Sequence, residues 1–224
     1  MTSNKSAPGT KPQTELQTRS VLPGFIVFEG LDGAGTTTQA RLFVERLRAG
    51  GAAVVATAEP TDGPIGRRIR AVLSGAEQAS DRTMAYLFAA DRSEHLDDPN
   101  HGVLAELHRG RYVVCDRYLF SSLAYQGSLC GFEFVRMLNA PFSLPEHLVF
   151  LDLQSKAGLE RIKARGRSEI YETPHIQDTV YHGYRQALEQ FRDSTMQIHH
   201  IDGSAAPEAI AEEVWSRIAI APIH

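Results

Sequence analysis

The chain is poor in cysteine and has no excess of basic charge. Only Cys115 and Cys130 occur among its 224 residues, and neither belongs to a CxxC pair or a zinc-type Cys/His cluster. Two cysteines cannot build a disulfide framework, so we expect a cytoplasmic protein. The formal net charge of -4 argues against nucleic acid or an anionic membrane as partner, because both select clustered Lys and Arg.

Long apolar runs are also missing. No run approaches the roughly 20 residues that cross a bilayer, and residues 1–20 lack the apolar core of a signal peptide. These first residues are polar and rich in Ser, Thr and Pro, so we expect a disordered extension, although a start codon placed too early would give the same composition. Residues 21–224 are predicted to form one domain.

Short apolar runs alternate with longer amphipathic stretches along this domain. We expect strands at Phe25 to Phe28, Ala52 to Ala56, Tyr112 to Cys115, Leu148 to Leu153, and Ile198 to Ile201. We expect helices at Thr37 to Arg48, Ile65 to Leu73, Thr83 to Arg109, Leu119 to Gly127, Lys156 to Arg165, Pro174 to Arg192, and Pro207 to Ile218. The alternation predicts an α/β fold with a five-stranded parallel sheet flanked by helices, and ligands at the carboxyl ends of the strands.

A glycine-rich turn directly follows the first expected strand. Its residues are Gly30, Leu31, Asp32, Gly33, Ala34, Gly35, Thr36, Thr37 and Thr38. They fit the phosphate-binding loop G-x-x-x-x-G-K-[ST] except at the lysine position, which Thr36 occupies. The glycines let successive backbone N–H groups converge on phosphate oxygens at a helix N-terminus, and Thr37 retains the hydroxyl expected to bind Mg²⁺. The turn therefore predicts an ATP-binding loop that lacks one positive charge.

Four further motifs follow the loop in order. They are Glu59-Pro60-Thr61-Asp62-Gly63-Pro64-Ile65-Gly66, Phe88-Ala89-Ala90-Asp91-Arg92, Asp116-Arg117-Tyr118, and Ser121-Ser122-Leu123-Ala124-Tyr125-Gln126-Gly127. This ordered set resembles the thymidylate kinase family from Gly24 to about Ile218. The resemblance implies the P-loop NTPase fold of nucleoside monophosphate kinases, ATP as phosphate donor, dTMP as acceptor, and a homodimer.

The resemblance also implies how the acceptor nucleotide is held. Phe88 would stack on the base, while Arg92, one helical turn later, would bond the pyrimidine edge and the monophosphate. Tyr125 would stand against the 2′ position of the sugar and exclude ribonucleotides, and Ser122 and Gln126 would bond the base edge. Core packing for Phe88, a salt bridge from Arg92 to Asp91 or Glu94, and a helix anchor for Tyr125 stay open as alternatives.

By the same resemblance, Arg117 would clamp the acceptor phosphate, and Asp116 would organise Mg²⁺ water or that arginine. Asp32 would accept a hydrogen bond from the sugar 3′-hydroxyl. Glu59 belongs to an Arg-Glu-Pro turn in the family, but Ala58 stands here in place of the arginine. A second positive charge is thus missing from the expected site.

A short basic lid is predicted at about residues 164–173. We expect Arg165 or Arg167 to compensate for Thr36 by reaching the transferring phosphoryl group, although arginines at a helix C-terminus are often only solvated. The segment departs from the family's common Asp-Arg-x-Glu pattern, which a shorter lid would explain.

The predicted function is transfer of the γ-phosphoryl of ATP to dTMP, giving dTDP and ADP, with Mg²⁺ as cofactor. Two alternatives stay open: a nucleotide-binding pseudokinase that has lost turnover, and a kinase for another deoxynucleoside or its monophosphate. The sequence disfavours a Rossmann dehydrogenase because Asp32 breaks G-x-G-x-x-G, and it disfavours a GTPase because no Asn-Lys-x-Asp stretch follows a strand.

Overall fold

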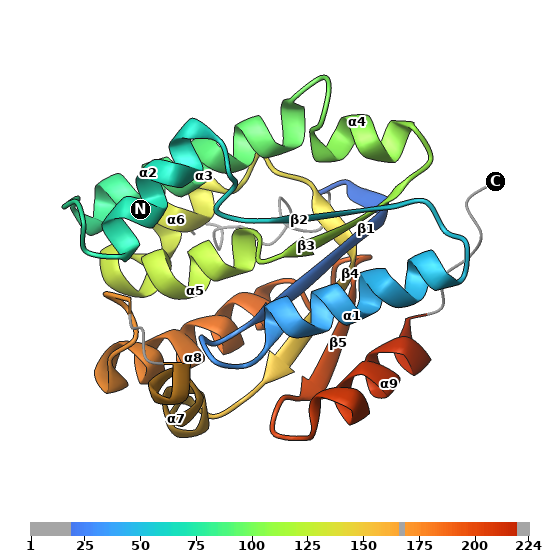
Figure 1. The fold of residues 1–224 in the computed structure, drawn as a ribbon. Coiled ribbons are helices and arrows are strands. Elements are labelled where there is room, and N and C mark those ends of the chain that lie inside the picture. Colours follow the sequence, from blue (N-terminus) through green and yellow to red (C-terminus); the bar gives the residue numbers. More distant parts are fainter. Residues whose placement is uncertain (1–18, 166–168, 219–224) are drawn as a thin grey trace, which may run out of the picture.

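A computed structural model describes residues 19–165 and 169–218 (Figure 1). The predicted N-terminal extension lies almost entirely outside these residues. Its last residue, Ser20, accepts a hydrogen bond from the backbone N–H of Leu144 at 2.8 Å. The described strands are β1 (Val21–Gly30), β2 (Val54–Ala58), β3 (Tyr112–Asp116), β4 (Leu144–Asp152), and β5 (Gln197–Asp202).

The five strands form one parallel sheet in the order β2-β3-β1-β4-β5. This arrangement confirms the predicted fold class. In the register, Phe28 of β1 pairs with Asp116 of β3, and Gly30 of β1 pairs with Leu151 of β4. The carboxyl ends of β1, β3 and β4 therefore meet at one edge of the sheet, which is where an open α/β sheet binds its ligands.

Helices cover both faces of the sheet (Figure 1). They are α1 (Thr36–Ala49), α2 (Pro64–Leu73), α3 (Asp81–Asp97), α4 (Val103–His108), α5 (Leu119–Cys130), α6 (Phe132–Leu138), α7 (Ser155–Arg165), α8 (Pro174–Gln190), and α9 (Pro207–Arg217). Side chains alternate between the faces as a pleated strand requires: Phe25 and Val27 pack with the core beneath α3, α5 and α8, whereas Ile26 and Phe28 pack with that of α1 and α9.

The structure differs from the expected helices at two places. The single helix expected from Thr83 to Arg109 is two helices, α3 and α4, because the chain turns between Asp98 and Gly102. A β-carbon at Gly102 would lie 2.5 Å from the backbone oxygen of Asp98, so the turn has no room for a side chain there. Helix α6 was not predicted from the sequence; Gly131, with a φ of 104°, separates it from α5.

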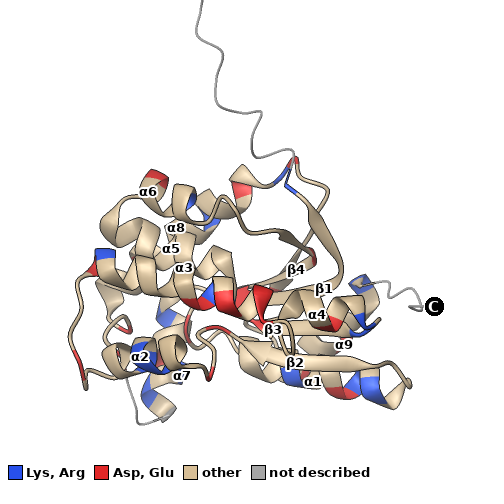
Figure 2. Cartoon of the chain, turned by 90° about the horizontal axis from the view of Figure 1, so that it is seen from above, with Lys and Arg blue, Asp and Glu red and all other residues tan. Residues whose placement is uncertain are grey.

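Charge is distributed over many helices. Basic and acidic residues mix over most of the surface, and α2 carries a run of basic residues (Figure 2). Within the described part of the chain, no helix has the length and apolar character to cross a membrane.

Candidate active site

A cavity of about 1300 Å³ opens at the carboxyl edge of the sheet. Its wall is formed by the glycine-rich loop, the turn after β2, α2, α3, the end of β3, α5, α7, the segment after residue 168, and the start of α9. Predicted site residues on this wall are Asp32, Gly33, Ala34, Gly35, Thr36, Thr37, Thr38, Glu59, Phe88, Arg92, Asp116, Arg117, Tyr125, and Gln126. The cavity exceeds the 300 to 1,000 Å³ common for a single small ligand.

The glycine-rich loop has the conformation that a phosphate cradle needs. Gly33 and Gly35 have φ values of 81° and 95°, in the left-handed region that glycine tolerates, and α1 begins directly after Gly35. Gly30 has little space for a side chain, because a β-carbon there would lie 3.0 Å from the backbone oxygen of Leu151. Leu31 is buried in the hydrophobic core, so its expected contact with ATP is restricted to its backbone. The first residues of α1 line the cavity, and the first N–H groups of a helix have no partner within it.

Thr37 and Asp116 meet at the base of the loop. The Thr37 hydroxyl donates to Asp116 Oδ2 at 2.5 Å, joining α1 to the end of β3. The second carboxylate oxygen of Asp116, Oδ1, is buried and has no hydrogen-bond partner. A buried acceptor without a partner is costly, so this oxygen is set up to meet a ligand or cation. Thr36 is nearly buried beside this pair.

Arg117 is held in the cavity by the loop itself. Its guanidinium donates from Nη2 to Asp32 Oδ1 at 2.7 Å and from Nη1 to the Gly30 carbonyl at 2.9 Å. Its backbone has a φ of 73°, a conformation rare for residues other than glycine and often found at functional sites. The Cys115 thiol donates to the Arg117 carbonyl at 2.9 Å and helps to fix this conformation.

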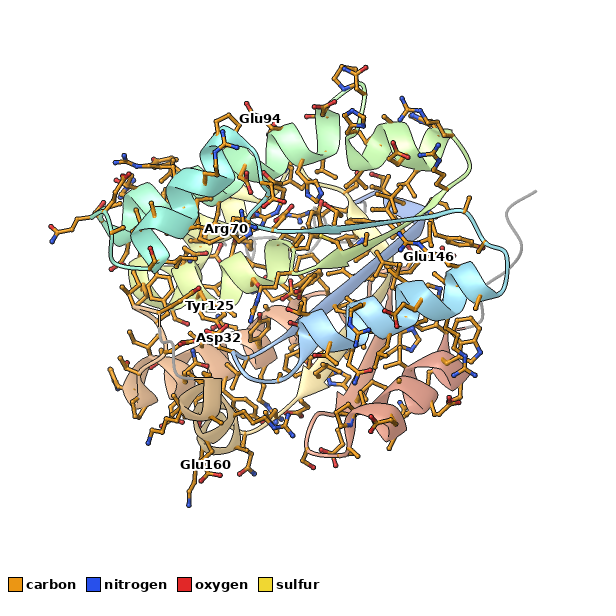
Figure 3. All side chains as sticks on the ribbon, viewed as in Figure 1. Asp32, Arg70, Glu94, Tyr125, Glu146 and Glu160 are labelled. Carbon is orange, nitrogen blue, oxygen red and sulfur yellow. The ribbon has the colours of Figure 1, made fainter. Side chains whose placement is uncertain are left out.

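Tyr125 lies against the same loop. The backbone N–H of Asp32 donates to Tyr125 Oη at 3.2 Å, and Figure 3 shows the two side chains next to one another at the loop. Burial, followed by the neighbouring Asp32 carboxylate, raises the pKa of Tyr125. The hydroxyl therefore stays protonated at neutral pH and keeps its role in the loop.

Two residues near Asp32, Gln177 and Tyr171, were not predicted from the sequence. Gln177 of α8 donates from Nε2 to Asp32 Oδ2 at 3.0 Å and to the Tyr171 carbonyl at 3.1 Å. Tyr171 is buried on the cavity wall, with its ring centroid 6.0 Å from that of Tyr125. Neither residue belongs to a motif. In the amphipathic pattern of α8, Gln177 looks like any other polar residue of the helix, so the sequence offered no signal for it.

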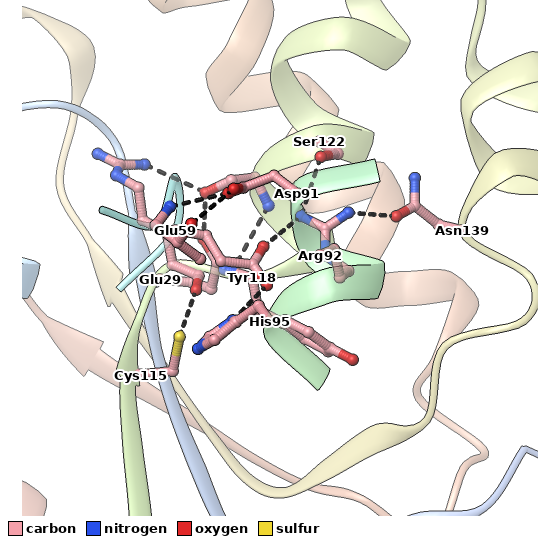
Figure 4. Close-up of polar contacts among 12 residues, drawn as sticks. Glu29, Glu59, Asp91, Arg92, His95, Cys115, Tyr118, Ser122 and Asn139 are labelled. Carbon is pink, nitrogen blue, oxygen red and sulfur yellow. Dashed lines mark hydrogen bonds and ion pairs between the residues drawn. The ribbon is translucent and has the colours of Figure 1, made fainter. Parts of the chain in front are cut away.

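Arg92 lies in a buried polar cluster at the wall of the cavity (Figure 4). Its Nη2 donates to Glu59 Oε2 at 2.6 Å and to Ser122 Oγ at 3.2 Å, while Nη1 donates to Asn139. His95 completes the cluster, with Nδ1 3.0 Å from Glu59 Oε1. The partner of Arg92 is thus Glu59 and not Asp91 or Glu94, the pairs left open from sequence.

The remaining base-site candidates divide between the wall and the interior. Phe88 and Gln126 line the cavity with Arg92, so the expected stacking residue and the expected base-edge residue share one chamber. Ser122 is buried, does not line the cavity, and bonds to Arg92. The Arg92 Nε is buried without a partner, so its N–H group is available to a ligand.

A fully buried carboxylate supports the junction between β1 and α5. Glu29 Oε1 accepts from the backbone N–H groups of Tyr118 and Ser121, and Oε2 accepts from the hydroxyls of Ser121 and Tyr184. Burial raises the pKa of Glu29, while Arg117 and these donors oppose the shift. The cluster fixes the start of α5 and thereby the direction of Tyr125.

The expected lid lies partly outside the described residues. Arg167 is among residues 166–168, and only the backbone of Arg165, at the end of α7, is described, so their expected compensation for Thr36 stays a prediction. Beyond the gap, the Ile170 N–H donates to the Leu73 carbonyl at 3.1 Å, which brings this segment onto α2. Of the expected lid, Glu169, Tyr171 and Glu172 line the cavity, and before the lid Arg161 of α7 lines it as well.

Comparison with known proteins agrees with this geometry. The family model described as thymidylate kinase matches residues 28–214. This chain belongs to the thymidylate kinase family. The match contains the glycine-rich loop, all four downstream motifs and the start of α9, so the family confirms the resemblance stated from the motifs.

Individual family members cover most of the chain. A Treponema pallidum protein of the same family name is 39% identical over 198 residues, which are 87% of this chain and 94% of that protein. The "Probable thymidylate kinase" of Pyrococcus abyssi is 37% identical over 85% of this chain and 93% of its own length. That of Methanococcus vannielii is 40% identical over 74% of this chain and 78% of its own length. Thymidylate kinases are ATP-dependent nucleoside monophosphate kinases, so the chain belongs to an enzyme family.

Proposed function

We propose that the chain transfers the γ-phosphoryl of ATP to dTMP, giving dTDP and ADP. The observation that carries this proposal is one cavity whose wall includes the glycine-rich loop, Arg117, Phe88 and Arg92. Such an arrangement places two nucleotides end to end, with their phosphates adjacent. Its volume of about 1300 Å³ suits two nucleotides better than one.

The acceptor is proposed to occupy the chamber of Phe88, Arg92 and Gln126. An aromatic ring offers a stacking surface to a pyrimidine, and the buried guanidinium and the amide offer donors to its edge. Tyr125 stands beside Asp32, where a sugar joining this base to a phosphate at Arg117 would pass. A 2′-hydroxyl would have to displace the Tyr125 ring, so a deoxyribose is favoured.

The transfer step needs no covalent enzyme intermediate. An oxygen of the acceptor phosphate attacks the γ-phosphorus, and the bond from that phosphorus to the β–γ bridging oxygen breaks, so that ADP leaves with the electron pair. The transition state spreads negative charge over the phosphoryl oxygens, and catalysis comes from positioning and electrostatics. Arg117 is proposed to bind the acceptor phosphate after exchanging part of its bond to Asp32, whose carboxylate then accepts from the sugar 3′-hydroxyl.

The residues at the base of the loop fit Mg²⁺. Thr37 Oγ1 and Asp116 Oδ2 are 2.5 Å apart, and the buried Asp116 Oδ1 has no partner, so both side chains can turn oxygen atoms toward a hard cation. Mg²⁺ commonly takes one or two protein oxygens and fills its other positions with water and phosphate. When bound, it would neutralise charge on the β- and γ-phosphates.

The proposed enzyme is a cytoplasmic homodimer. Tyr86 of α3 and Met137 of α6 expose 49% and 61% of their surface, and the Tyr86 ring packs edge-on against Phe134 of α6, with centroids 5.5 Å apart. Large exposed apolar side chains on neighbouring helices are typical of subunit contacts. Both cysteines are free thiols, which fits a reducing compartment.

A coupled ADP-release assay tests the proposed activity. Purified protein with ATP and Mg²⁺ receives dTMP, dUMP, dCMP or no acceptor, and we expect turnover that is fastest with dTMP. Faster turnover with another acceptor would replace dTMP in the proposal. Nucleotide binding without turnover would contradict the proposed activity and indicate a pseudokinase, an alternative that membership of the thymidylate kinase family does not favour.

A further inference from the structure

We propose that Arg161 supplies the positive charge that Thr36 cannot provide at the donor phosphates. The inference rests on the proposed function for the identity of the donor, and it concerns the same cavity. It assigns the compensating cation to α7 itself, one turn before the expected Arg165. Arg161 is exposed and lines the cavity together with the whole stretch from Asp32 to Gln39.

The topology brings α7 onto the glycine-rich loop. The loop follows β1 and α7 follows β4, and these strands are direct neighbours in the sheet. A β-carbon at Gly33 would lie 2.4 Å from the Gly158 carbonyl oxygen, and one at Gly158 would lie 2.6 Å from the Asp32 carbonyl oxygen. Loop and helix are therefore in backbone contact, with no space for a side chain on either partner. Arg161 is three residues after Gly158, so it lies on the same side of α7.

The contacts of Arg161 hold its guanidinium at the loop. Nη1 donates to the Gly33 carbonyl at 3.3 Å and to the Gly203 carbonyl at 3.0 Å, and Nη2 is 3.5 Å from the Ser204 carbonyl. Gly203 and Ser204 follow β5, so the side chain spans the gap between the loop and the segment before α9. These partners are neutral carbonyls. Within the described chain, no carboxylate pairs with Arg161, and its charge stays available to an anion.

Three other described arginines of the cavity wall are less suitable. Arg92 is paired with Glu59, and Arg117 is paired with Asp32. Arg70 lies on the far side of the sheet edge, where it donates to the carbonyls of Pro60 and Thr61 after β2. Strand β2 is separated from β1 by β3, so this arginine is nearer to the acceptor side than to the donor phosphates. Arg161 combines a free charge with direct contact to the loop.

The chemistry of a guanidinium fits this position. A phosphate loop already offers backbone N–H groups, and the charge missing at Thr36 acts chiefly on the β- and γ-phosphates during transfer. A planar guanidinium can give two parallel N–H bonds to phosphate oxygens while its other N–H groups keep their carbonyl partners. Binding of the phosphate chain would exchange the weaker contacts, those to Gly33 and Ser204, for charge-assisted ones.

Steady-state kinetics of Arg161→Gln test the assignment. We expect kcat to fall about 10² to 10³-fold, the loss typical of one strong transition-state contact, while the KM for dTMP changes less than twofold. Lys163→Gln is the matched control, because Lys163 is an exposed cation of the same helix and does not line the cavity. It should keep the activity of the unmodified protein.

A rescue experiment separates charge from a merely structural role. If Arg161 replaces the missing lysine, the double variant Thr36→Lys, Arg161→Gln should have a kcat at least tenfold higher than that of Arg161→Gln alone. If Arg161 only held α7 against the loop, a cation at position 36 would not raise the kcat of Arg161→Gln. Equal kcat for Arg161→Gln and Lys163→Gln, or a loss that Thr36→Lys leaves unchanged, would overturn the proposal.

Ligand binding keeps the test independent of turnover. The affinity for ADP, measured by the fluorescence of an N-methylanthraniloyl derivative, should fall about tenfold in Arg161→Gln and much less in Arg161→Lys, while dTMP affinity is unchanged. An unchanged ADP affinity would refute the role of Arg161 even if dTMP is phosphorylated. If Arg161→Gln lowers the ADP affinity but the unmodified protein does not phosphorylate dTMP, the role of Arg161 in donor binding is kept and the proposed reaction is rejected.

Discussion

Removal of the Glu59 carboxylate should destabilise the protein strongly. Glu59 and Arg92 form an ion pair at 2.6 Å, and their side chains expose only 2% and 1% of their surface. In Glu59→Ala the guanidinium keeps Asn139 and Ser122 but loses its counter-charge at a position that is almost fully buried. Breaking one half of a buried pair costs about 3 to 5 kcal/mol.

The matched control is a pair with the same geometry and a different environment. Arg41 and Glu45 of α1 are also 2.6 Å apart, but they expose 59% and 53% of their side chains. Exposed pairs of this kind contribute about 0.3 to 0.5 kcal/mol because water screens them. The comparison therefore varies burial while the distance stays constant.

Urea denaturation of Glu59→Ala and Glu45→Ala, followed by circular dichroism, measures both changes. We expect a loss of about 3 to 5 kcal/mol for the first and about 0.5 kcal/mol or less for the second. At 2 to 4 °C per kcal/mol, the melting temperature of Glu59→Ala should fall by roughly 6 to 20 °C. Similar losses for the two variants would refute the reasoning, because burial would then not decide the cost.

Three further outcomes follow from the structure. Burial and then His147 lower the pKa of His199 to about 4, and burial lowers that of His147 despite Glu146. In the unfolded chain both histidines titrate near 6.5, so the folded protein should lose stability as pH falls from about 6.5 to about 4. We expect a loss of about 1 to 2 kcal/mol after allowance for solvent screening. A melting temperature that stays constant over this pH range, as in a His199→Gln variant, would contradict this. Tyr125→Ala should lower the kcat/KM preference for dTMP over its ribose analogue about tenfold, whereas Tyr125→Phe should keep it, and an unchanged ratio in both would remove the 2′ role. Phe88→Ala should raise the KM for dTMP about five- to tenfold through lost stacking, with the KM for ATP as the internal control.

The sheet and the phosphate loop could be predicted because their signals are local. Each strand is a short apolar run, and the turn from Gly30 to Thr38 needs glycine at fixed positions for its backbone. The break between α3 and α4 was also local, at Pro99 and Gly102, but the polar stretch around them fitted a long amphipathic helix equally well. There the periodicity outweighed two helix breakers.

The partners within the site could not be predicted in the same way. Glu59 and Arg92 are 33 positions apart, and Asp32 and Gln177 are 145 apart, so no spacing rule joins them. The nearby acids Asp91 and Glu94 looked equally suitable for Arg92, but Asp91 instead accepts from Thr61. Which charges stay unpaired in the cavity, and thus which cation faces the donor, depends on these long-range choices.

Transfer of labelled phosphate tests the central claim most directly. Protein is incubated with Mg²⁺, dTMP and ATP labelled at the γ-phosphorus, and the products are separated by chromatography. The account predicts that the label appears in dTDP in equal amount to the ADP formed, and that this depends on dTMP. Label found only in inorganic phosphate, or retained in ATP while both nucleotides bind, would contradict it.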